Sequence, residues 1–270
     1  LYGRCLRIAI NNGFCFAGNA ALFGSADIRI ATKNSWIGMA GPAMIEGGGL
    51  GKFDPKEIGP SDIQKNNGVI DYVAEDEKEA TVIAKKILSY FQGEIKDWKA
   101  DDQTQLSNIM PKDRRWSYPV RDIIKIISDI EQFTEIRAEY GKGIVSCFIR
   151  IEGKPFGLLA NDSQHLGGAI DSEGADKASS FIEMCSEYGL PLISLVDTPG
   201  FMVGPDSEKE GAVRRMSNLF KIGSKVKVPL TAIFLRKGYG LGAQAMVGGS
   251  LHEPVSVSYT HLTLPTSFLV

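Results

Sequence analysis

Short apolar runs alternate with longer amphipathic stretches along most of the chain. Apolar runs bounded by glycine, proline or polar residues predict strands, and apolar residues spaced three and four apart predict helices. The expected strands cover residues 7–10, 27–31, 69–73, 144–152, 156–160, 192–196 and 230–235. The expected helices cover about residues 17–25, 75–91, 120–130, 173–188 and 208–221. Alternating strands and helices predict an α/β fold in which loops at the sheet edges carry the chemistry.

Two segments interrupt this alternation. Residues 38–51 hold six glycines in fourteen positions, which predicts a long loop that lies close against a neighbouring group or moves. Residues 93–118 are polar, charged and interrupted by Pro111, which predicts a linker between two lobes.

Two similar eight-residue strings occur at residues 13–20 and 238–245, and each follows an apolar run and leads into a predicted helix. A strand that breaks at glycine and restarts as a helix leaves backbone N–H groups without partners, and these can hold a developing negative charge. A tight strand-to-helix crossing that needs small residues is the alternative for either string taken singly. The matched pair, with Asn19 or Gln244 in each, favours two repeated halves, each with an oxyanion pocket.

Composition and charge exclude several classes of protein. At 270 residues the chain has room for one large domain or two smaller ones, and 43% hydrophobic residues is ordinary for a globular protein. A net charge of −2 gives no bulk attraction to nucleic acid or to an anionic membrane. No apolar run reaches the roughly 18 residues of a membrane span. The four cysteines form no CxxC pair, so we expect reduced, buried thiols in a cytoplasmic protein.

Other motifs favour structural roles. The run from Asp197 to Gly200 resembles a GTPase loop, but no Gly-Lys pair is followed by Ser or Thr, so nucleotide hydrolysis is not expected. His165 and His252 lie among glycines, which favours hydrogen bonds to loop backbone over catalysis. Helix-cap or turn roles are expected for three aspartates, and no metal site is predicted; these aspartates are Asp162, Asp171 and Asp176. The acidic run 75–79 predicts the first turn of a helix.

Four separated runs resemble one family. Residues 38–51, 161–171, 197–204 and 236–243 are similar to the beta-type carboxyltransferase subunit of biotin-dependent acyl-CoA carboxylases, in the crotonase-like superfamily. The resemblance covers about residues 3–256. It implies two crotonase-like lobes, incomplete at both termini: residues 1–110 on the acyl-CoA side and 111–256 on the biotin side.

The resemblance also implies an activity and partners. The enzyme would transfer a carboxyl group from carboxybiotin, held on a biotin carrier protein, to the α carbon of an acyl-CoA such as acetyl- or propionyl-CoA. A homo-oligomer is implied, either a dimer or a dimer-built hexamer, because the first lobe of one subunit faces the second lobe of its partner. A biotin carboxylase or biotin carrier subunit would be a further partner. Acyl-chain length stays open, because Gln244 stands where many propionyl-CoA-type relatives carry an acid.

Site residues follow by position in the matching motifs. The enolate pocket falls at Ala17 and Gly18, and the biotin ureido pocket at Gly242 and Ala243. The residues implied on the CoA side are Gly41, Gly47, Gly48 and Gly49. The residues implied on the biotin side are Gly167, Gly168, Ala169, Phe201 and Gly204, with Gly240 and Leu241 at the pocket entrance.

Three alternatives remain open. A biotin-dependent acyl-CoA decarboxylase subunit would use the same pockets in reverse. A crotonase-type hydratase or isomerase would need paired carboxylates beside one glycine turn, and residues 20–22 and 245–247 offer none. A scaffolding subunit that binds a biotinylated partner would not need the first repeat. The chain has no initial Met, and residues 257–270 resemble a translated sequencing adapter, so we expect a fragment with an artefactual tail.

Overall fold

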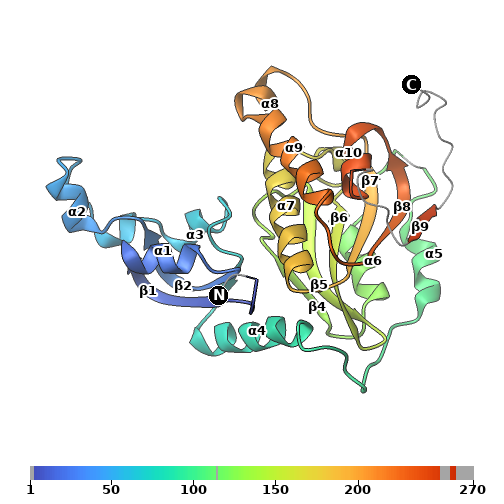
Figure 1. Ribbon diagram of the computed structural model, residues 1–270, viewed down its shortest axis with the longest axis horizontal. Coiled ribbons are helices and arrows are strands. Elements are labelled where there is room, and N and C mark those ends of the chain that lie inside the picture. The colour runs from blue at the N-terminus through green and yellow to red at the C-terminus, as the bar shows by residue number, and fades with distance from the viewer. Residues whose placement is uncertain (1–2, 114, 250–255, 260–270) are drawn as a thin grey trace. The chain divides into compact units, whose positions relative to one another are not determined.

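The computed structural model describes residues 3–113, 115–249 and 256–259 (Figure 1). The described chain forms two compact units, each built on its own sheet. The first unit comprises the residues up to Gly93 together with Glu135–Tyr140. The second unit comprises Glu94–Thr134 and the residues from Gly141 onward. The tail expected to be an artefact covers residues 257–270, and of these residues 260–270 lie outside the described part of the chain.

The first unit contains a three-stranded parallel sheet in the order β1-β2-β3. Its strands are β1 (Ile8–Phe16), β2 (Ile28–Gly38) and β3 (Tyr72–Ala74). Its helices are α1 (Gly18–Gly24), α2 (Pro42–Gly47), the 3-10 turn η1 (Pro55–Glu57), α3 (Ser61–Gln64) and α4 (Glu77–Tyr90).

Local sequence explains where α4 begins and which face it buries. The Asp76 side chain accepts a hydrogen bond from the Glu79 N–H at 2.8 Å, which satisfies one unpaired donor of the first turn. The buried residues of the helix are Ala80, Ile87 and Tyr90. The expected solvated acidic first turn of this helix is therefore confirmed.

The second unit contains a six-stranded sheet in the order β4-β5-β6-β7-β8-β9. Its strands are β4 (Phe133–Ile136), β5 (Ile144–Ile151), β6 (Lys154–Asn161), β7 (Leu192–Thr198), β8 (Leu230–Gly238) and β9 (Ser256–Tyr259). Strands β5 and β6 form an antiparallel hairpin, and β6 to β9 run parallel. Parallel neighbours place their carboxyl ends at one edge, where ligand sites of open α/β sheets form.

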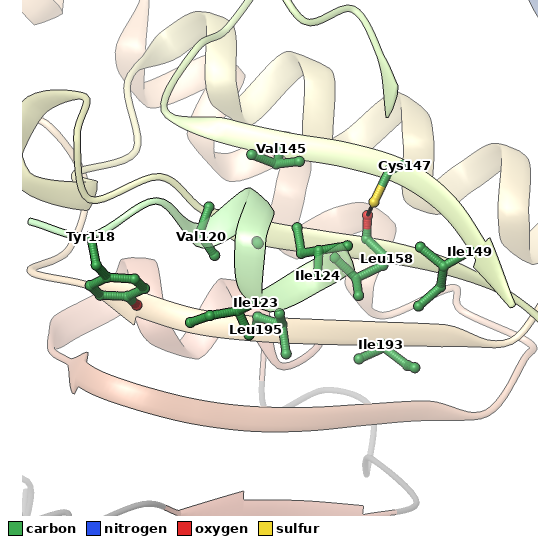
Figure 2. Packing of buried hydrophobic residues seen from close by; sticks show 11 residues of the cluster. Tyr118, Val120, Ile123, Ile124, Val145, Cys147, Ile149, Leu158, Ile193 and Leu195 are labelled. Carbon is green, nitrogen blue, oxygen red and sulfur yellow. Dashed lines mark hydrogen bonds between the residues drawn. The ribbon is translucent and has the colours of Figure 1, made fainter. Parts of the chain in front are cut away.

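Helices cover both faces of this second sheet, so its central strands are buried throughout. One face packs against α6 (Val120–Ile127), whose Ile123 and Ile124 contact strand residues such as Leu158 and Leu195 (Figure 2). The other face packs against α7 (Ser172–Glu187), where the Phe148 and Phe181 rings lie 5.4 Å apart. The remaining elements are η2 (Gln103–Gln105), α5 (Leu106–Ile109), η3 (Leu166–Gly168), α8 (Pro205–Lys209), α9 (Ala212–Gly223) and α10 (Gly240–Met246).

Both sheets contain a β-bulge near the strand ends. In the first unit, the pairing of β1 with β2 shifts so that Asn12 alone faces residues 32–34. In the second unit, the pairing of β7 with β8 shifts so that Asp197 alone faces residues 235–237. Bulges interrupt the ladder of backbone hydrogen bonds and redirect the chain next to functional sites.

Several expected elements differ in extent. The helix expected at 208–221 is two helices, because Gly211 adopts a left-handed conformation with φ 75° between them. The loop expected at 38–51 contains α2, which begins at Pro42 after the N-cap Gly41. The linker expected at 93–118 contains η2 and α5, and Leu106 and Ile109 of α5 pack against the core of the second unit.

Three of the four cysteines are buried, and one is exposed. Cys15, Cys147 and Cys185 are buried free thiols as expected, whereas Cys5 is exposed, so burial was wrongly expected for that residue. Burial raises the pKa of the Cys15 and Cys185 thiols, which keeps them protonated. Within the described part of the chain, no helix combines the length and apolar character needed to cross a membrane.

Candidate active site

The first candidate pocket is the junction between β1 and α1. Its N-cap Ala17 has φ 53° and ψ −123°, a conformation that costs a residue with a Cβ of order 1–3 kcal/mol. The Ala17 N–H donates to the Gly38 carbonyl at 3.2 Å. Among the described hydrogen bonds, none engages the backbone N–H groups of Gly18, Asn19 or Ala20. The turn therefore presents three consecutive donors, and Gly18 and Asn19 are exposed.

The CoA-side glycines lie on and around α2. Gly41 is the N-cap of α2, and a Cβ built there would lie 3.3 Å from the Phe16 ring, so this end of the helix adjoins the first junction. Gly47 and Gly48 end α2, and Gly49 follows with φ 74°. Figure 1 shows α2 extending beyond the sheet of its unit. Of the four glycines, Gly41 is thus joined to the junction through Phe16, whereas Cβ atoms on Gly47 and Gly49 would meet nothing within 4 Å.

The second candidate pocket is the junction between β8 and α10. The N–H of its N-cap Tyr239 donates to the Thr198 carbonyl at 3.1 Å. No described hydrogen bond engages the N–H groups of Gly240, Leu241 and Gly242. The Ala243 N–H, by contrast, donates within the helix to the Tyr239 carbonyl at 3.4 Å. The open donors at this turn therefore begin at Gly240 and end before Ala243.

The two junctions share an architecture but not the register of the sequence strings. When the two sequence strings are aligned, Gly13 corresponds to Gly238. In the structure, however, β1 ends at Phe16 and β8 ends at Gly238, so Phe16 is the residue equivalent to Gly238. In the first unit, β1 continues through Gly13 to Phe16 before the turn. Expecting the first turn to begin at Gly13 was therefore wrong, because a strand can accommodate an isolated glycine, particularly beside a bulge.

Most of the residues expected on the biotin side meet around the second junction. A Cβ on Gly242 would lie 2.6 Å from the Gly200 carbonyl carbon and 2.9 Å from the Phe201 nitrogen, so α10 docks directly on this loop. A Cβ on Gly168 would lie 2.3 Å from the Asp197 carbonyl oxygen. The loop that holds Gly167, Gly168 and Ala169 is tied to the Phe201 loop, because the Ile170 N–H donates to the Gly200 carbonyl at 3.0 Å. Gly204 is the exposed N-cap of α8, further along the Phe201 loop.

An ionic cluster lies beneath this junction, and sequence reasoning assigned it no role. Asp197, fully buried, accepts from the Arg236 side chain through Nε at 3.0 Å and through Nη2 at 2.9 Å. Lys237 donates through Nζ to the Gly167 carbonyl. Burial lowers the pKa of Lys237, an effect that Asp197 partly opposes. The sequence did contain a signal for this cluster. Asp197 lies near the end of one buried strand, and the basic residues Arg236 and Lys237 lie near the end of the next.

The expected structural roles of the aspartates are confirmed for two of them. Asp171 caps α7 by accepting from the Gly174 N–H at 2.7 Å, and Asp162 accepts from the Gln164 N–H at 3.0 Å. The His165 N–H donates to the Asp162 carbonyl at 3.1 Å, whereas its ring Nε2 lies 3.4 Å from Asp171 Oδ2, so the ring contacts a carboxylate and not the loop backbone expected for it. His252 lies outside the described residues. The described residues include no group of three or more His, Cys, Asp or Glu side chains placed to hold a metal ion.

An apolar cavity of about 380 Å³ lies in the same unit. Its lining includes none of the residues expected at the site. Arg236 belongs both to this lining and to the ionic cluster. The lining residues are Leu106, Met110, Pro111, Lys112, Ile123, Ile127, Leu195, Ile233, Leu235 and Arg236.

The arrangement favours stabilising anions with backbone donors. Each junction presents consecutive N–H groups at a turn that packing fixes in place, which is the arrangement of an oxyanion hole. A single amide donor of this kind typically contributes about 3–4 kcal/mol to a transition state. Two such junctions can therefore serve a reaction that develops negative charge at two oxygen atoms.

Comparisons with known proteins identify similar chains. The methylmalonyl-CoA carboxyltransferase 12S subunit of Propionibacterium freudenreichii subsp. shermanii is 32% identical over 260 residues, which are 93% of this chain and 50% of that protein. The biotin-dependent acetyl-/propionyl-coenzyme A carboxylase beta6 subunit of Mycobacterium tuberculosis is 32% identical over 88% of this chain and 52% of its own length. The chain thus spans about half the length of the curated relatives it matches.

Solved structures share the fold and the family pattern. A single-chain, multi-domain long-chain acyl-CoA carboxylase superposes with a TM-score of 0.92 at 50% identity, over 96% of this chain and 26% of that one. The transcarboxylase 12S structure, described as a hexamer with methylmalonyl-coenzyme A bound, superposes with a TM-score of 0.83 at 32% identity, over 92% of this chain and 50% of that one. These matches confirm the expected α/β, crotonase-like fold. The carboxyl transferase domain model matches residues 1–261, so the chain belongs to the carboxyl transferase family of biotin-dependent acyl-CoA carboxylases.

Proposed function

We propose that the chain transfers a carboxyl group from carboxybiotin, carried on a biotin carrier protein, to the α carbon of an acyl-CoA. The observation that carries this proposal is the pair of strand-to-helix junctions, each with three consecutive backbone N–H groups that no described hydrogen bond uses. Membership of the carboxyl transferase family supports the reaction type. The first lobe, proposed at residues 1–110, takes the acyl-CoA, and the second lobe, at 111–256, takes the biotin.

The first junction is proposed to stabilise the enolate of the thioester. Bound carboxybiotin, on giving up its carboxyl group, would supply the base that takes the α-proton of the thioester. The negative charge then placed on the thioester oxygen would be stabilised by the N–H groups that begin at Gly18. The Ala17 N–H already donates to Gly38, so Ala17 contributes the strained turn rather than a donor. Gly41 adjoins this turn, and the glycines at 47–49 are proposed to line the CoA path.

The second junction is proposed to receive the biotin ring at Gly240, where an added Cβ meets nothing within 4 Å, while Gly168 and Gly242 allow the close backbone packing that fixes the turn. Cβ atoms on Gly168 or Gly242 would collide with backbone at 2.3 Å and 2.6 Å. Bound carboxybiotin supplies the carboxyl group and a ureido oxygen on which charge develops. We assign the donors to the N–H groups from Gly240 to Gly242, because the Ala243 N–H is engaged by Tyr239. Ala243 then supports the turn from behind, since it is buried.

Phe201 and the segment from Gly167 to Ala169 are proposed to flank the biotin, because both pack against the second junction. Gly204 is proposed at the outer end of the same face. A homo-oligomer, either a dimer or a hexamer built from dimers, and a biotin carboxylase or carrier subunit complete the proposed assembly, in keeping with the hexamer described for transcarboxylase 12S. The cytoplasm is the proposed compartment, consistent with free buried thiols.

The first experiment removes one donor from the enolate junction. Gly18→Pro deletes the N–H at the first helical position, and a Cβ there meets nothing within 4 Å. Because proline also restricts the backbone of Ala17, the variant must first match the circular dichroism and thermal midpoint of wild type. We expect kcat for carboxyl transfer to fall by about 10²–10³-fold. Gly18→Ala is the matched control because it keeps the N–H. The assay uses the complete gene product with carboxylated biotin and acetyl-, propionyl- and longer acyl-CoA thioesters, and equal rates for the two variants would reject this junction.

The second experiment applies the same logic at the other junction. Leu241→Pro deletes an N–H in the first turn of α10, whereas Leu241→Ala shortens an exposed side chain and keeps the donor. We expect the proline variant alone to lose about 10²-fold or more in transfer from free carboxybiotin. A similar loss in both variants would instead implicate the side chain.

A biotin-dependent decarboxylase running the same chemistry in reverse is the second candidate, because both junctions would serve it equally. Measured rates in the two directions, with the complete assembly, decide between these functions. Formation of carboxybiotin from carboxylated acyl-CoA without measurable forward transfer would favour the decarboxylase.

A further inference from the structure

The bulge at the end of β8 is filled by a charged side chain. Asp197 on β7 lies opposite three residues of β8, so the backbone ladder is interrupted there. The Lys237 N–H finds its acceptor in the Asp197 carboxylate, at 3.0 Å from Oδ1. A side-chain oxygen thus replaces the backbone acceptor that a regular ladder would provide.

Arg236 neutralises this carboxylate and is itself held in place. Its Nε and Nη2 atoms both donate to Asp197 Oδ2, at 3.0 and 2.9 Å. The Asp197 side chain is 0% exposed and the Arg236 side chain 6%, so neither charge has water as an alternative partner. The guanidinium carbon lies 4.5 Å from the centre of the Tyr118 ring, and Nη1 donates to the Trp116 carbonyl.

The same aspartate also fixes the neighbouring strand ends. Its N–H donates to Oδ1 of Asn161, the last residue of β6, at 3.1 Å. A Cβ on Gly168 would lie 2.3 Å from the Asp197 carbonyl oxygen, so the loop that holds Gly168 packs directly against the end of β7. The adjacent Thr198 carbonyl accepts from the Tyr239 N–H at 3.1 Å, immediately before the open donors of α10.

We infer that Asp197, paired with Arg236, is a positioning residue that aims the backbone donors of the second junction. The inference rests on the proposed function and deepens it, because it names what holds the biotin-side donors in place. The carboxylate touches no reacting atom; it sets where β8 ends and hence where Gly240 begins the turn.

The bulge of the first junction is bridged by neutral side chains of β1 and β2, and the carboxylate to which Asn12 Nδ2 donates, Glu77, belongs to α4. There Thr32 Oγ1 donates to Asn12 Oδ1 at 2.7 Å, and Ser35 Oγ donates to the Asn11 carbonyl at 3.1 Å. Loss of the charge at Asp197 should therefore affect the biotin side and leave the acyl-CoA side unchanged.

The test compares Asp197→Asn with wild type in the complete gene product, in its native assembly. A displacement of about 1 Å at a reacting centre can cost about 10²-fold in rate, so kcat/KM for free carboxybiotin should fall about 100-fold. KM for acyl-CoA and the mass of the assembly should change little, whereas the thermal midpoint should fall, because the change leaves Arg236 charged and buried without its partner. Arg236→Lys should give the same selective loss, smaller in size, because it keeps the charge and loses the planar fork.

Asp176→Asn is the matched control. It removes a partly exposed carboxylate that pairs with Arg215 at 3.3 Å in the same unit, and kcat/KM should stay within about twofold of wild type because exposed pairs contribute little. If Asp197→Asn does not fold, the double variant Asp197→Asn/Arg236→Gln removes both charges together and should fold while keeping the selective defect.

The outcomes separate the two levels of the proposal. A wild-type protein without carboxyl transfer in either direction rejects the proposed function. An active wild type with a folded, fully active Asp197→Asn or double variant rejects the inference alone. Equal losses in carboxybiotin and acyl-CoA parameters also reject it, since they would indicate a general structural role.

Discussion

Ala17 shows how one residue can store strain at a working turn. Its φ of 53° and ψ of −123° lie outside the regions that residues with a Cβ ordinarily adopt. Such conformations persist only where the surrounding structure determines them, and they cluster at active sites. Here the turn must reverse direction between β1 and α1 while leaving the following N–H groups uncovered. The strain is therefore a second, independent sign that this junction has a function.

Replacing Ala17 with glycine should relieve that strain. The expected gain in the free energy of unfolding is about 1 kcal/mol, since a strain of order 1–3 kcal/mol is partly offset by the entropy that glycine loses on folding. The matched change Ala21→Gly, inside the same helix, should instead lower it by roughly 0.5–1 kcal/mol. Urea denaturation of both variants measures the difference, and a loss at both sites would show that Ala17 is unstrained.

The strand-to-helix junctions are the elements that sequence reasoning located best. Apolar runs correctly indicated β5, β7 and β8, and helical spacing indicated α4 and α7, because burial imposes those patterns directly. The junction register could not be read from the strings, since Gly13 lies within a strand. Asp197 and Arg236 were visible as residues, but their pairing depends on which strands become neighbours. That is a tertiary fact, and one sequence does not reveal it.

Glycine at position 242 is required by packing between elements. Gly242→Ala would place a Cβ 2.8 Å from the Gly200 Cα, so α10 or the loop must shift, at a cost of about 1–3 kcal/mol typical of overpacking. Gly47→Ala, in α2, meets nothing within 4 Å and should raise stability by about 0.5–1 kcal/mol. Thermal or urea unfolding should show opposite signs, and equal effects would mean that α10 does not dock as described.

At the scale of the whole molecule, the first unit includes the segment Glu135–Tyr140, which follows the first segment of the second unit along the sequence. Asp71, fully buried, pairs with Arg29 at 2.9 Å and with Arg137, and the Arg137 N–H donates to the Asp71 carbonyl at 2.7 Å. Burial alone would raise the pKa of Asp71, but the two guanidinium groups outweigh it and hold the pKa below its usual range.

The sign of the resulting pH dependence follows from that direction. Because the folded-state pKa lies below the unfolded value of about 3.9, the stabilisation is complete above that pH and is lost as the pH falls below it. Asp71→Asn should lower the free energy of unfolding by about 3–5 kcal/mol at pH 7 and flatten its acid dependence. Asp62 forms an exposed pair with Lys65, so Asp62→Asn should change neither the free energy of unfolding nor its dependence on pH. If Asp71→Asn kept the wild-type loss of stability at acid pH, this assignment would be contradicted.

The return of Glu135–Tyr140 to the first unit also limits how this gene can be divided. A cut after Gly93 would separate Asp71 from Arg137 and leave a buried carboxylate short of one guanidinium partner. Recombination that shuffled either lobe as a contiguous block would inherit the same defect. Inheritance as one continuous reading frame is therefore what this topology favours.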